Sequence, residues 1–385
     1  MKKWNILHRQ ELSRNDLMES MSIPEEIGQI LLNRGVETQD QVKMFTDPSL
    51  KYLRDPFQLK DMDRTVERVR RAISENEKIW IFGDYDVDGV SSTSIMILYF
   101  KSIGYPVDYY IPNRLEEGYG LNTEAIDHIA SKDGSLIITV DCGITSVKEG
   151  DYAKGLGIDV IITDHHECQE KLPDAYAVVN PKRDDSSYPF EGICGCGVAF
   201  KLIHALSGNE EFYRNINRYL EIVSLATICD IMPILDENRI IVKNGMEILG
   251  QGNNLGMQAL LEVCGLDGTK IKSSHLGFAI GPRINASGRL GFSKLGVELF
   301  TSDSLEEAKS LALMMDSKNT ERQEVEARIY MEVEDILSKD TSYRDDKVLV
   351  ISGKDWHHGI IGIVASKVTE KYYKPCICLL YTSDA

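Results

Sequence analysis

The sequence predicts an α/β fold with a doubly wound, mostly parallel sheet, and two observations indicate it. Apolar runs rich in Ile and Val at 78–83, 135–140 and 159–163 are each bounded by Gly or Asp, as buried parallel strands are. Segments with helical periodicity separate these runs, and such strand–helix alternation produces right-handed crossovers within one sheet. We therefore expect the strands to lie together with helices on both faces.

The first half of the chain supplies the other elements of this sheet. Residues 1–75 carry helical periodicity, and the amphipathic stretch at 63–73 has a basic face, which we interpret as solvated rather than bound to DNA. Residues 90–103 are predicted to be a helix, while 107–111 and 177–180 are further strands.

The second half has a different pattern. From 240 to 340 the periodicity is helical, and its charged end at 304–339 suits a connector between domains. A strand at 346–352 and a helix at 359–373 then open a second α/β unit, which is cut short after these two elements. We predict four parts: an N-terminal helical segment (1–75), a catalytic α/β domain (76–235), a helical region and connector (236–340), and the start of a truncated second domain (341–385).

Composition excludes several classes of protein. The 43 Lys and Arg against 60 Asp and Glu give a formal net charge of −17, which argues against non-specific coating of nucleic acid. A nuclease remains open, because its positive field can be local or carried by metal. No segment is long and apolar enough to span a bilayer, and the scattered cysteines fit reduced thiols, so we expect a cytoplasmic protein. We interpret Cys194, Cys196, Cys376 and Cys378 as structural or incidental rather than as zinc half-sites.

Acids and histidines follow three of the predicted strands, at the point where each strand ends. These residues are Asp84, Asp86, Asp88, Asp141, Asp164, His165 and His166. In an open parallel sheet, polar groups at the carboxyl ends of adjacent strands converge in one crevice. Carboxylates a few Å apart raise each other's pKa, so the group requires a counter-charge. A divalent metal is the simplest one, and the sequence predicts a metal site.

The run Asp84, Asp86 and Asp88 resembles the start of a calcium loop as well. Such a loop needs a Glu at its twelfth position and a helix before it. Position 95 is Ile and a strand precedes the run, so we reject the calcium interpretation. Alternation instead places the three acids on one side of the backbone.

His165, His166 and Asp230 extend the candidate site. Neighbouring side chains at a strand end point to opposite sides, so we expect one histidine to bind metal and the other to face the substrate. Asp230 ends an apolar helical stretch, and a buried aspartate needs a partner that a metal would supply.

Two further motifs contain candidate phosphate-binding groups. The glycine-rich stretch at 192–201 is either a turn whose backbone N–H groups approach phosphate or a tight turn with glycines at positive φ, and both stay open. The stretch at 281–290 is predicted to be a flexible polar loop, and its Arg283 and Arg289 suit bidentate phosphate capture.

Taken together, the motifs at 84–89, 141–143, 164–166 and 229–230 resemble the four motifs of the DHH phosphoesterase superfamily, and within it the bacterial exonucleases specific for single-stranded DNA. Similar stretches outside these motifs are 31–35, 111–121, 281–289 and 356–366. The resemblance implies a metal-dependent 5′-to-3′ exonuclease of DNA repair and recombination, with single-stranded DNA as its partner and no membrane. We expect a monomer.

The resemblance also implies that the family pattern stops before the end of the second domain. Relatives continue through a complete second domain and a nucleic-acid-binding barrel, whereas the residues after about 378 resemble nothing in the family. We interpret the chain as a truncated fragment and expect it to bind single strands weakly.

With the resemblance in place we assign roles. A set of carboxylates with one imidazole suits two Mn²⁺ or Mg²⁺ ions. The assigned metal ligands are Asp86, Asp88, Asp141, His165 and Asp230. Asp84 is an auxiliary acid, Asp164 orients its neighbours, and His166 faces the scissile phosphate. The candidate phosphate holders are Arg114, Arg283 and Arg289.

Two alternatives remain. One is a sister activity of the superfamily, a pyrophosphatase or a phosphodiesterase on oligonucleotides or cyclic dinucleotides. The other is a non-catalytic single-strand-binding relative. The N-terminal extension and the 281–289 stretch favour the exonuclease, and the complete set of acids argues against a pure binder.

Overall fold

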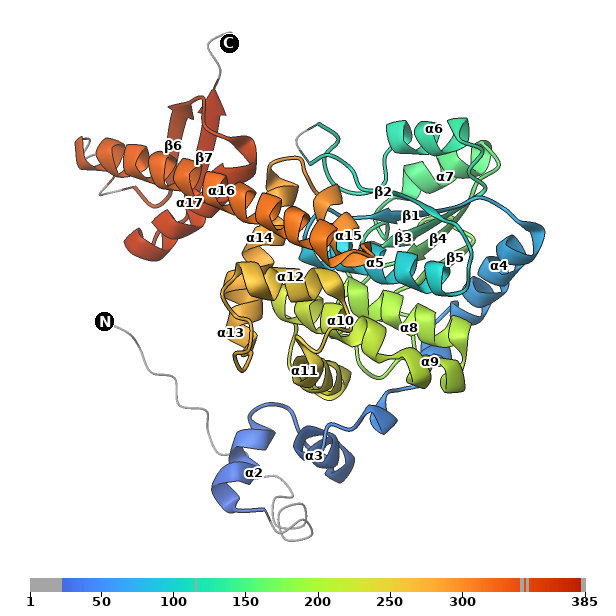
Figure 1. The fold of residues 1–385 in the computed structure, drawn as a ribbon. Coiled ribbons are helices and arrows are strands. Elements are labelled where there is room, and N and C mark those ends of the chain that lie inside the picture. The colour runs from blue at the N-terminus through green and yellow to red at the C-terminus, as the bar shows by residue number, and fades with distance from the viewer. Residues whose placement is uncertain (1–22, 115, 340–342, 344–345, 382–385) are drawn as a thin grey trace.

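A computed structural model of the chain describes residues 23–381, except 115, 340–342 and 344–345. At its centre is a five-stranded parallel sheet in the order β2-β1-β3-β4-β5 (Figure 1). The strands are β1 (Ile79–Gly83), β2 (Asp108–Tyr110), β3 (Leu136–Val140), β4 (Asp159–Thr163) and β5 (Ala177–Val179). The doubly wound parallel sheet predicted from the sequence is confirmed.

Helices cover both faces of this sheet (Figure 1). One face packs on α4 (Met62–Glu75), α5 (Val87–Ser102) and α8 (Gly195–Ser207), and the other on α6 (Thr123–Ser131) and α7 (Val147–Gly155). Alternate side chains of β1 divide between the two cores: Ile81 joins the larger one, whereas Trp80 and Phe82 join the smaller. Burial on both faces explains why the strands are continuous apolar runs.

A layer of helices follows the sheet in the chain, as predicted. Its members are α9 (Asn209–Asn215), α10 (Asn217–Cys229), α11 (Asp236–Ile248), α12 (Leu255–Val263), α13 (Ser273–His275), the π-helical turn η3 (Leu276–Ile280), α14 (Gly281–Arg289) and α15 (Lys294–Thr301). The predicted connector is one long helix, α16 (Leu305–Lys339), which leads away from the sheet to the second unit (Figure 1). The expectation of a flexible loop at 281–290 is wrong, because those residues form α14.

The second unit has one element more than we expected. It contains β6 (Leu349–Lys354), α17 (His358–Tyr372) and a further strand, β7 (Cys376–Tyr381), which pairs in parallel with β6. The apolar run at 376–381 supplies this strand. Ile360 and Val364 of α17 are fully buried, in one cluster with Ile329 and Val333 of α16, so the unit packs back onto the connector. Residues 382–385 lie outside the described part.

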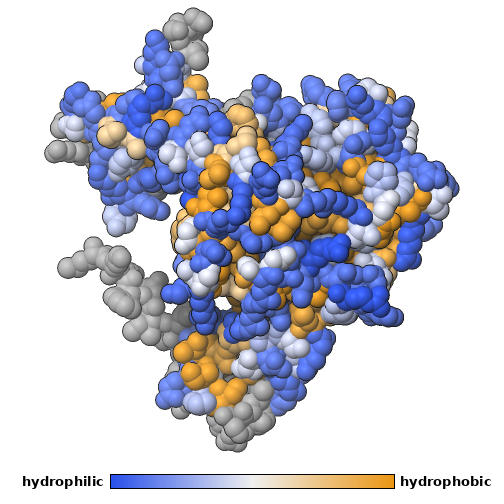
Figure 2. Space-filling view, viewed as in Figure 1, coloured by the Kyte–Doolittle hydropathy of each residue, from blue (hydrophilic) through white to orange (hydrophobic). Residues whose placement is uncertain are grey.

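The N-terminal region is helical from residue 25, and the prediction for 1–22 lies outside the described residues. Its elements are α2 (Glu25–Leu32), α3 (Gln39–Thr46) and the short 3-10 turns η1 (Leu50–Tyr52) and η2 (Pro56–Gln58). Hydrophobic surface is visible at the end of the molecule where α2 and α3 lie (Figure 2), and Ile27 and Ile30 of α2 are half-exposed.

The basic face of α4 forms ion pairs within the protein: Arg68 is buried in ion pairs with Glu77 and Asp159. The four-part domain division stays a prediction.

No described helix is long and apolar enough to cross a membrane.

Candidate metal centre

The predicted site residues lie at the carboxyl edge of the sheet, where chain order reverses between β1 and β3. Gly83, Val140 and Thr163 are level with one another across the three central strands. The residues that follow them, Asp84, Asp141 and Asp164, therefore leave the sheet at the same height. Ligands of open α/β sheets bind at such a switch point.

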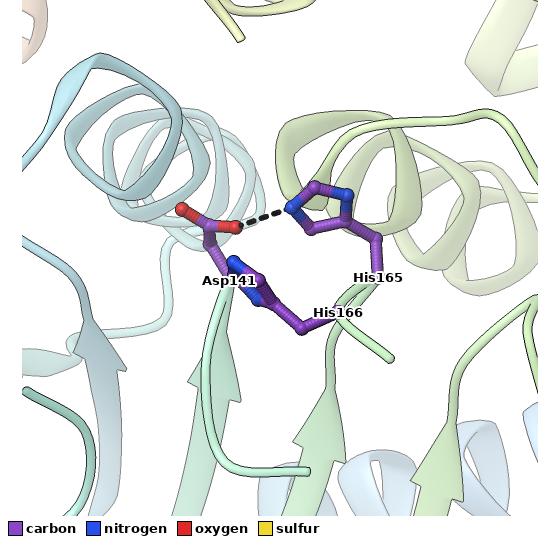
Figure 3. Close-up of side chains that lie close together, drawn as sticks. All are labelled: Asp141, His165 and His166. Carbon is purple, nitrogen blue, oxygen red and sulfur yellow. Dashed lines mark ion pairs between the residues drawn. The ribbon is translucent and has the colours of Figure 1, made fainter. Parts of the chain in front are cut away.

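His165 lies at the middle of the acids. Its Nε2 is 3.1 Å from Oδ1 of Asp141, 3.6 Å from Oδ2 of Asp88 and 3.7 Å from Oδ2 of Asp230. Figure 3 shows Asp141 and the two histidines converging from the ends of neighbouring strands. Potential ligand atoms lie within 4.8 Å of one another in three groups: Asp141 with His165 and His166, Asp88 with His165 and Asp230, and Asp84 with Asp86 and Asp141. The structure thus brings together all seven residues predicted as catalytic.

Helix N-termini hold two of the acids in place. Asp86 caps α5, because its Oδ1 accepts hydrogen bonds from the backbone N–H groups of Asp88 (2.8 Å) and Gly89 (3.1 Å). The Asp88 carboxylate accepts from the N–H groups of Gly195 (2.6 Å) and Cys196 (2.8 Å), which begin α8. The N–H groups that we considered for phosphate thus hold a carboxylate of the site itself.

Gly195 is required by close packing against Asp141. A Cβ atom at this position would lie 2.4 Å from Oδ1 of Asp141. Asp141 itself has a left-handed backbone with φ of 61°, which is uncommon outside glycine and costs about 1–3 kcal/mol. The surroundings of Asp141 must therefore maintain this conformation at the end of β3.

Asp164 orients the histidines, as its sequence position suggested. Its carboxylate accepts hydrogen bonds from the backbone N–H groups of Ile144, His165 and His166, and it is 2.7 Å from Nδ1 of His166. Burial alone would raise the pKa of Asp164, but the bond to His166 and the N–H donors outweigh it and lower that pKa. Asp164 is therefore an anion that the protein satisfies without a metal.

The two histidines do not point to opposite sides, so that expectation is wrong. Their ring centroids are 4.5 Å apart, and both residues lie beyond the end of β4 at Thr163. They differ in environment instead. His165 is buried, and burial lowers its pKa. The side chain of His166 is 45% exposed, and its bond to Asp164 raises its pKa, which leaves Nε2 as the ring atom for an anionic substrate.

When Asp84, Asp141 and Asp230 are ionised, the protein does not fully compensate their charge. Burial is the first cause and neighbouring acids the second, and together they raise the pKa of Asp84 to about 8 and that of Asp230 to about 6. Among the described residues, buried oxygens of Asp84, Asp141 and Asp230 have no hydrogen-bond partner. The Nε2 of His165 approaches Oδ1 of Asp141 without forming a hydrogen bond, and the Nδ1 of His165 is unpartnered too.

This donor set fits a hard divalent cation. Carboxylate oxygens with one imidazole suit Mn²⁺ or Mg²⁺, and unpartnered buried oxygens are the atoms that such an ion would satisfy. The neighbouring thiols of Cys142, Cys194 and Cys196 have pKa values raised by burial, so they stay protonated and do not offer the thiolates that zinc prefers.

The three predicted phosphate-binding arginines are in different situations. The Arg114 guanidinium lies 4.9 Å from the ring centre of Tyr85, beside the acids. Arg289 donates to the carbonyl of Gly359 at 3.0 Å, and burial together with Arg114 and Arg322 lowers its pKa. Arg283 is engaged elsewhere, since it forms an ion pair of 2.8 Å with Asp316.

Helix α14 supports the aspartate run instead of forming a loop. The Oδ1 of Asn285 accepts a hydrogen bond of 3.2 Å from the N–H of Val87. A Cβ atom at Gly288 would lie 2.1 Å from the carbonyl oxygen of Tyr85, so the two backbones touch. This contact overrides the low helix propensity of the segment.

The sequence analysis did not identify Tyr119, Glu237 or Asn238. The hydroxyl of Tyr119 lies 3.4 Å from the carbonyl oxygen of Asp141 and 3.3 Å from Nδ1 of His166. Its neighbours Gly118 and Gly120 both have positive φ, and a tyrosine between two glycines was the available signal. Glu237 and Asn238 gave no local signal, because the side-chain partners of Glu237 and one partner of Asn238, Gly192, are distant in the sequence.

Comparisons with known proteins agree with this architecture. The family model "DHH family, N-terminal domain" matches residues 78–227. Single-stranded-DNA-specific exonuclease RecJ of Bacillus subtilis is 39% identical, with 98% of this chain and 47% of that protein aligned. The RecJ of Escherichia coli is 35% identical, with 97% and 67% aligned.

Solved structures give the same result. A manganese-bound exonuclease RecJ superposes with a TM-score of 0.74 at 31% identity, over 84% of this chain and 80% of that one. RecJ of Thermus thermophilus in complex with Mn²⁺ superposes with a TM-score of 0.81 at 27% identity, over 98% and 54%. The chain thus spans about half the length of some relatives and two thirds of others. Because the match to relatives such as that of E. coli is above 30% identity over two thirds of their length, this chain belongs to the RecJ family of single-stranded-DNA-specific exonucleases.

Proposed function

We propose that this chain carries the catalytic centre of a metal-dependent 5′-to-3′ exonuclease that hydrolyses phosphodiester bonds of single-stranded DNA. The observation that carries the proposal is the group of acids around His165, whose buried oxygens lack partners within the described residues. The B. subtilis and E. coli relatives are named for the same activity. We place the protein in the cytoplasm, in DNA repair and recombination, and as a monomer.

Five residues would hold two Mn²⁺ or Mg²⁺ ions: Asp86, Asp88, Asp141, His165 and Asp230. The RecJ structures with Mn²⁺ and with Mg²⁺ support this choice of metal. Bound divalent ions supply an activated water for attack on phosphorus and neutralise charge on the phosphate. Asp84 is an auxiliary acid whose raised pKa follows from burial.

The chain's own residues then bind and orient the phosphate. His166 is exposed beside the acids, and its bond to Asp164 fixes the ring so that Nε2 can donate to a phosphoryl oxygen. Arg114 and Arg289 would bind the phosphate of the substrate. Arg283 is paired with Asp316, so it could bind phosphate only after that ion pair breaks.

A substrate panel tests this function. The chain is incubated with Mn²⁺ and four substrates: single strands labelled at the 5′ or the 3′ end, duplex DNA, a dinucleotide, and pyrophosphate. We expect 5′-labelled single strands to release label first as mononucleotide, with duplex left intact. Faster turnover of the dinucleotide or of pyrophosphate would favour the sister activities of the superfamily, and DNA binding without hydrolysis would favour a binding module.

A further inference from the structure

Asn238, in the first turn of α11, joins the loop before α8 to the loop that follows Asp230. Its side chain is buried, with the residue only 1% exposed. Its Nδ2 donates to the carbonyl oxygens of Gly192 (2.5 Å) and Pro233 (3.0 Å). A side-chain amide has two N–H donors, and both are used here.

One loop leads to backbone N–H groups that hold an acid of the site, and the other directly follows an acid of the site. Gly192 is followed by the start of α8, whose first N–H groups hold the Asp88 carboxylate. Pro233 follows Asp230 along the chain. The loops touch each other, since a Cβ atom at Gly192 would lie 2.9 Å from Cγ of Pro233. This contact therefore helps to set the position of Asp88 relative to Asp230, in addition to the direct packing of α5 on α10.

The loop after Asp230 is strained and needs such support. Ile231 has a φ of 58°, which is unusual for a β-branched residue, and the residue is 89% exposed, so packing does not hold it there. Strained backbone persists only where the surroundings determine it. The hydrogen bond from Asn238 to Pro233 is one of the bonds that do so, together with that from the N–H of Met232 to Thr227.

We propose that Asn238 is a positioning residue of the metal centre, which fixes the gap between Asp88 and Asp230 by binding both loops with one amide. The inference rests on the proposed function in so far as that function requires a metal. Without the amide, the carbonyl oxygen of Gly192 would lose this donor and that of Pro233 would keep the N–H of Leu235, so one side chain would no longer join the two loops. His165 lies between the same two acids, at 3.6 and 3.7 Å, so a wider gap would disturb the ligand set.

The chain offers a matched control on the same helix. The Nδ2 of Asn244 also donates to two backbone carbonyls, those of Pro48 (2.8 Å) and Ile240 (2.7 Å), but neither belongs to a loop of the site. Asn238→Leu and Asn244→Leu each remove two hydrogen bonds and keep the branched shape and the number of side-chain heavy atoms. A loss of metal affinity in the first variant alone would separate positioning from a general loss of stability.

The experiment is a calorimetric titration of MnCl₂ into the parent chain and both variants. Urea unfolding of the metal-free proteins gives the stability of each one. We expect Asn238→Leu to bind Mn²⁺ about 10- to 100-fold more weakly, as changes to residues that orient ligands do, and Asn244→Leu to bind like the parent. At saturating Mn²⁺, Asn238→Leu should regain most of its kcat with an unchanged KM for DNA.

Parent-like Mn²⁺ affinity in Asn238→Leu would overturn the inference, and so would an equal loss in both variants. If Asn238→Leu does not fold, Asn238→Ser, which keeps one donor, is titrated instead; a several-fold loss supports the role and no loss overturns it. A parent chain that binds Mn²⁺ but leaves DNA intact contradicts only the proposed exonuclease. A parent that binds no Mn²⁺ overturns both.

Discussion

Two clusters of buried charge can be compared. One is the group of acids around His165, which includes Asp230, and the other surrounds Asp236 and Glu237. They differ in whether other groups of the protein pair with the buried charges. In the second, both oxygens of Glu237 have partners: the N–H of Arg54 and the Nζ of Lys201 bind one, and the hydroxyl of Tyr188 binds the other. Asp236 forms a bidentate pair with Arg54. Among the described residues, no such partners reach the buried oxygens of Asp84, Asp141 and Asp230.

The difference shows how to distinguish a structural cluster from a binding site. Burying a charge without a partner costs several kcal/mol, so a fold keeps such groups only where something else stabilises them. The Glu237 cluster is complete in the chain and joins α8, α11 and the segment before η2. The cluster around His165 is incomplete within the described residues, which is the property expected of a metal site.

The largest expected effect comes from removing an acid from the incomplete cluster. Asp141→Asn should abolish hydrolysis of a 5′-labelled single strand, because a group close to both sets of ligands is lost. The same change should make the metal-free chain more stable, by at least about 1 kcal/mol at pH 8, since burial raises the pKa of Asp141 well above its usual range. Urea unfolding in EDTA measures this gain. A loss of stability would mean that Asp141 is already satisfied.

In the complete cluster around Glu237, removing a charged residue is expected to lower the free energy of unfolding. Lys201→Met leaves Glu237 buried without its ammonium partner and should cost about 3–5 kcal/mol of unfolding free energy. The double variant Lys201→Met, Glu237→Leu should recover much of that loss, because no unpaired charge remains. Added Mn²⁺ should stabilise the parent and Lys201→Met by the same amount. Unequal stabilisation would show that the two clusters are coupled.

His166 tests the division of roles inside the metal site. His166→Ala should leave Mn²⁺ affinity nearly unchanged and lower turnover by roughly 100-fold or more, if the ring stabilises charge on the phosphate. His165→Ala serves as the control, and it should lose metal affinity first. Equal losses of metal affinity in the two variants would contradict the separate roles.

Sequence reasoning found the incomplete cluster because its signals are local. Asp84, Asp141 and Asp164 directly follow apolar runs, and the parallel sheet brings the ends of those runs together. It missed the complete cluster and Asn238, because their partners, such as Arg54 and Gly192, are distant in the sequence and nothing local marks the pairing. The α14 segment was missed for a related reason: its glycines suggest a loop, and only the contact of Gly288 with Tyr85 shows why a helix forms there.

The smallest expected effect concerns Glu221, which belongs to neither cluster. It lies on α10, the helix that ends before Asp230, and the residue is 1% exposed. Burial raises its pKa to about 7, opposed by hydrogen bonds from the side chain of Asn253 and the backbone N–H groups of Asn254 and Gly250. Among the described residues it forms no ion pair, so it is a carboxylate with hydrogen bonds but without a cation.

The sign of its pH dependence follows from the raised pKa. Between the usual Glu value of 4.5 and about 7, the folded chain holds a proton that the unfolded chain has released, so this group's contribution to stability falls as pH rises. The shift sets an upper limit of roughly 3 kcal/mol, and we expect about half of it after local relaxation. Glu221→Gln should therefore stabilise the chain at pH 8 and leave its stability at pH 5 nearly unchanged, as measured by urea unfolding. The control Glu247→Gln, at an exposed residue paired with Lys243, should show no such pH-dependent gain. An equal gain for Glu221→Gln at both pH values would mean that the amide packs better, and that the charge of Glu221 costs the fold nothing.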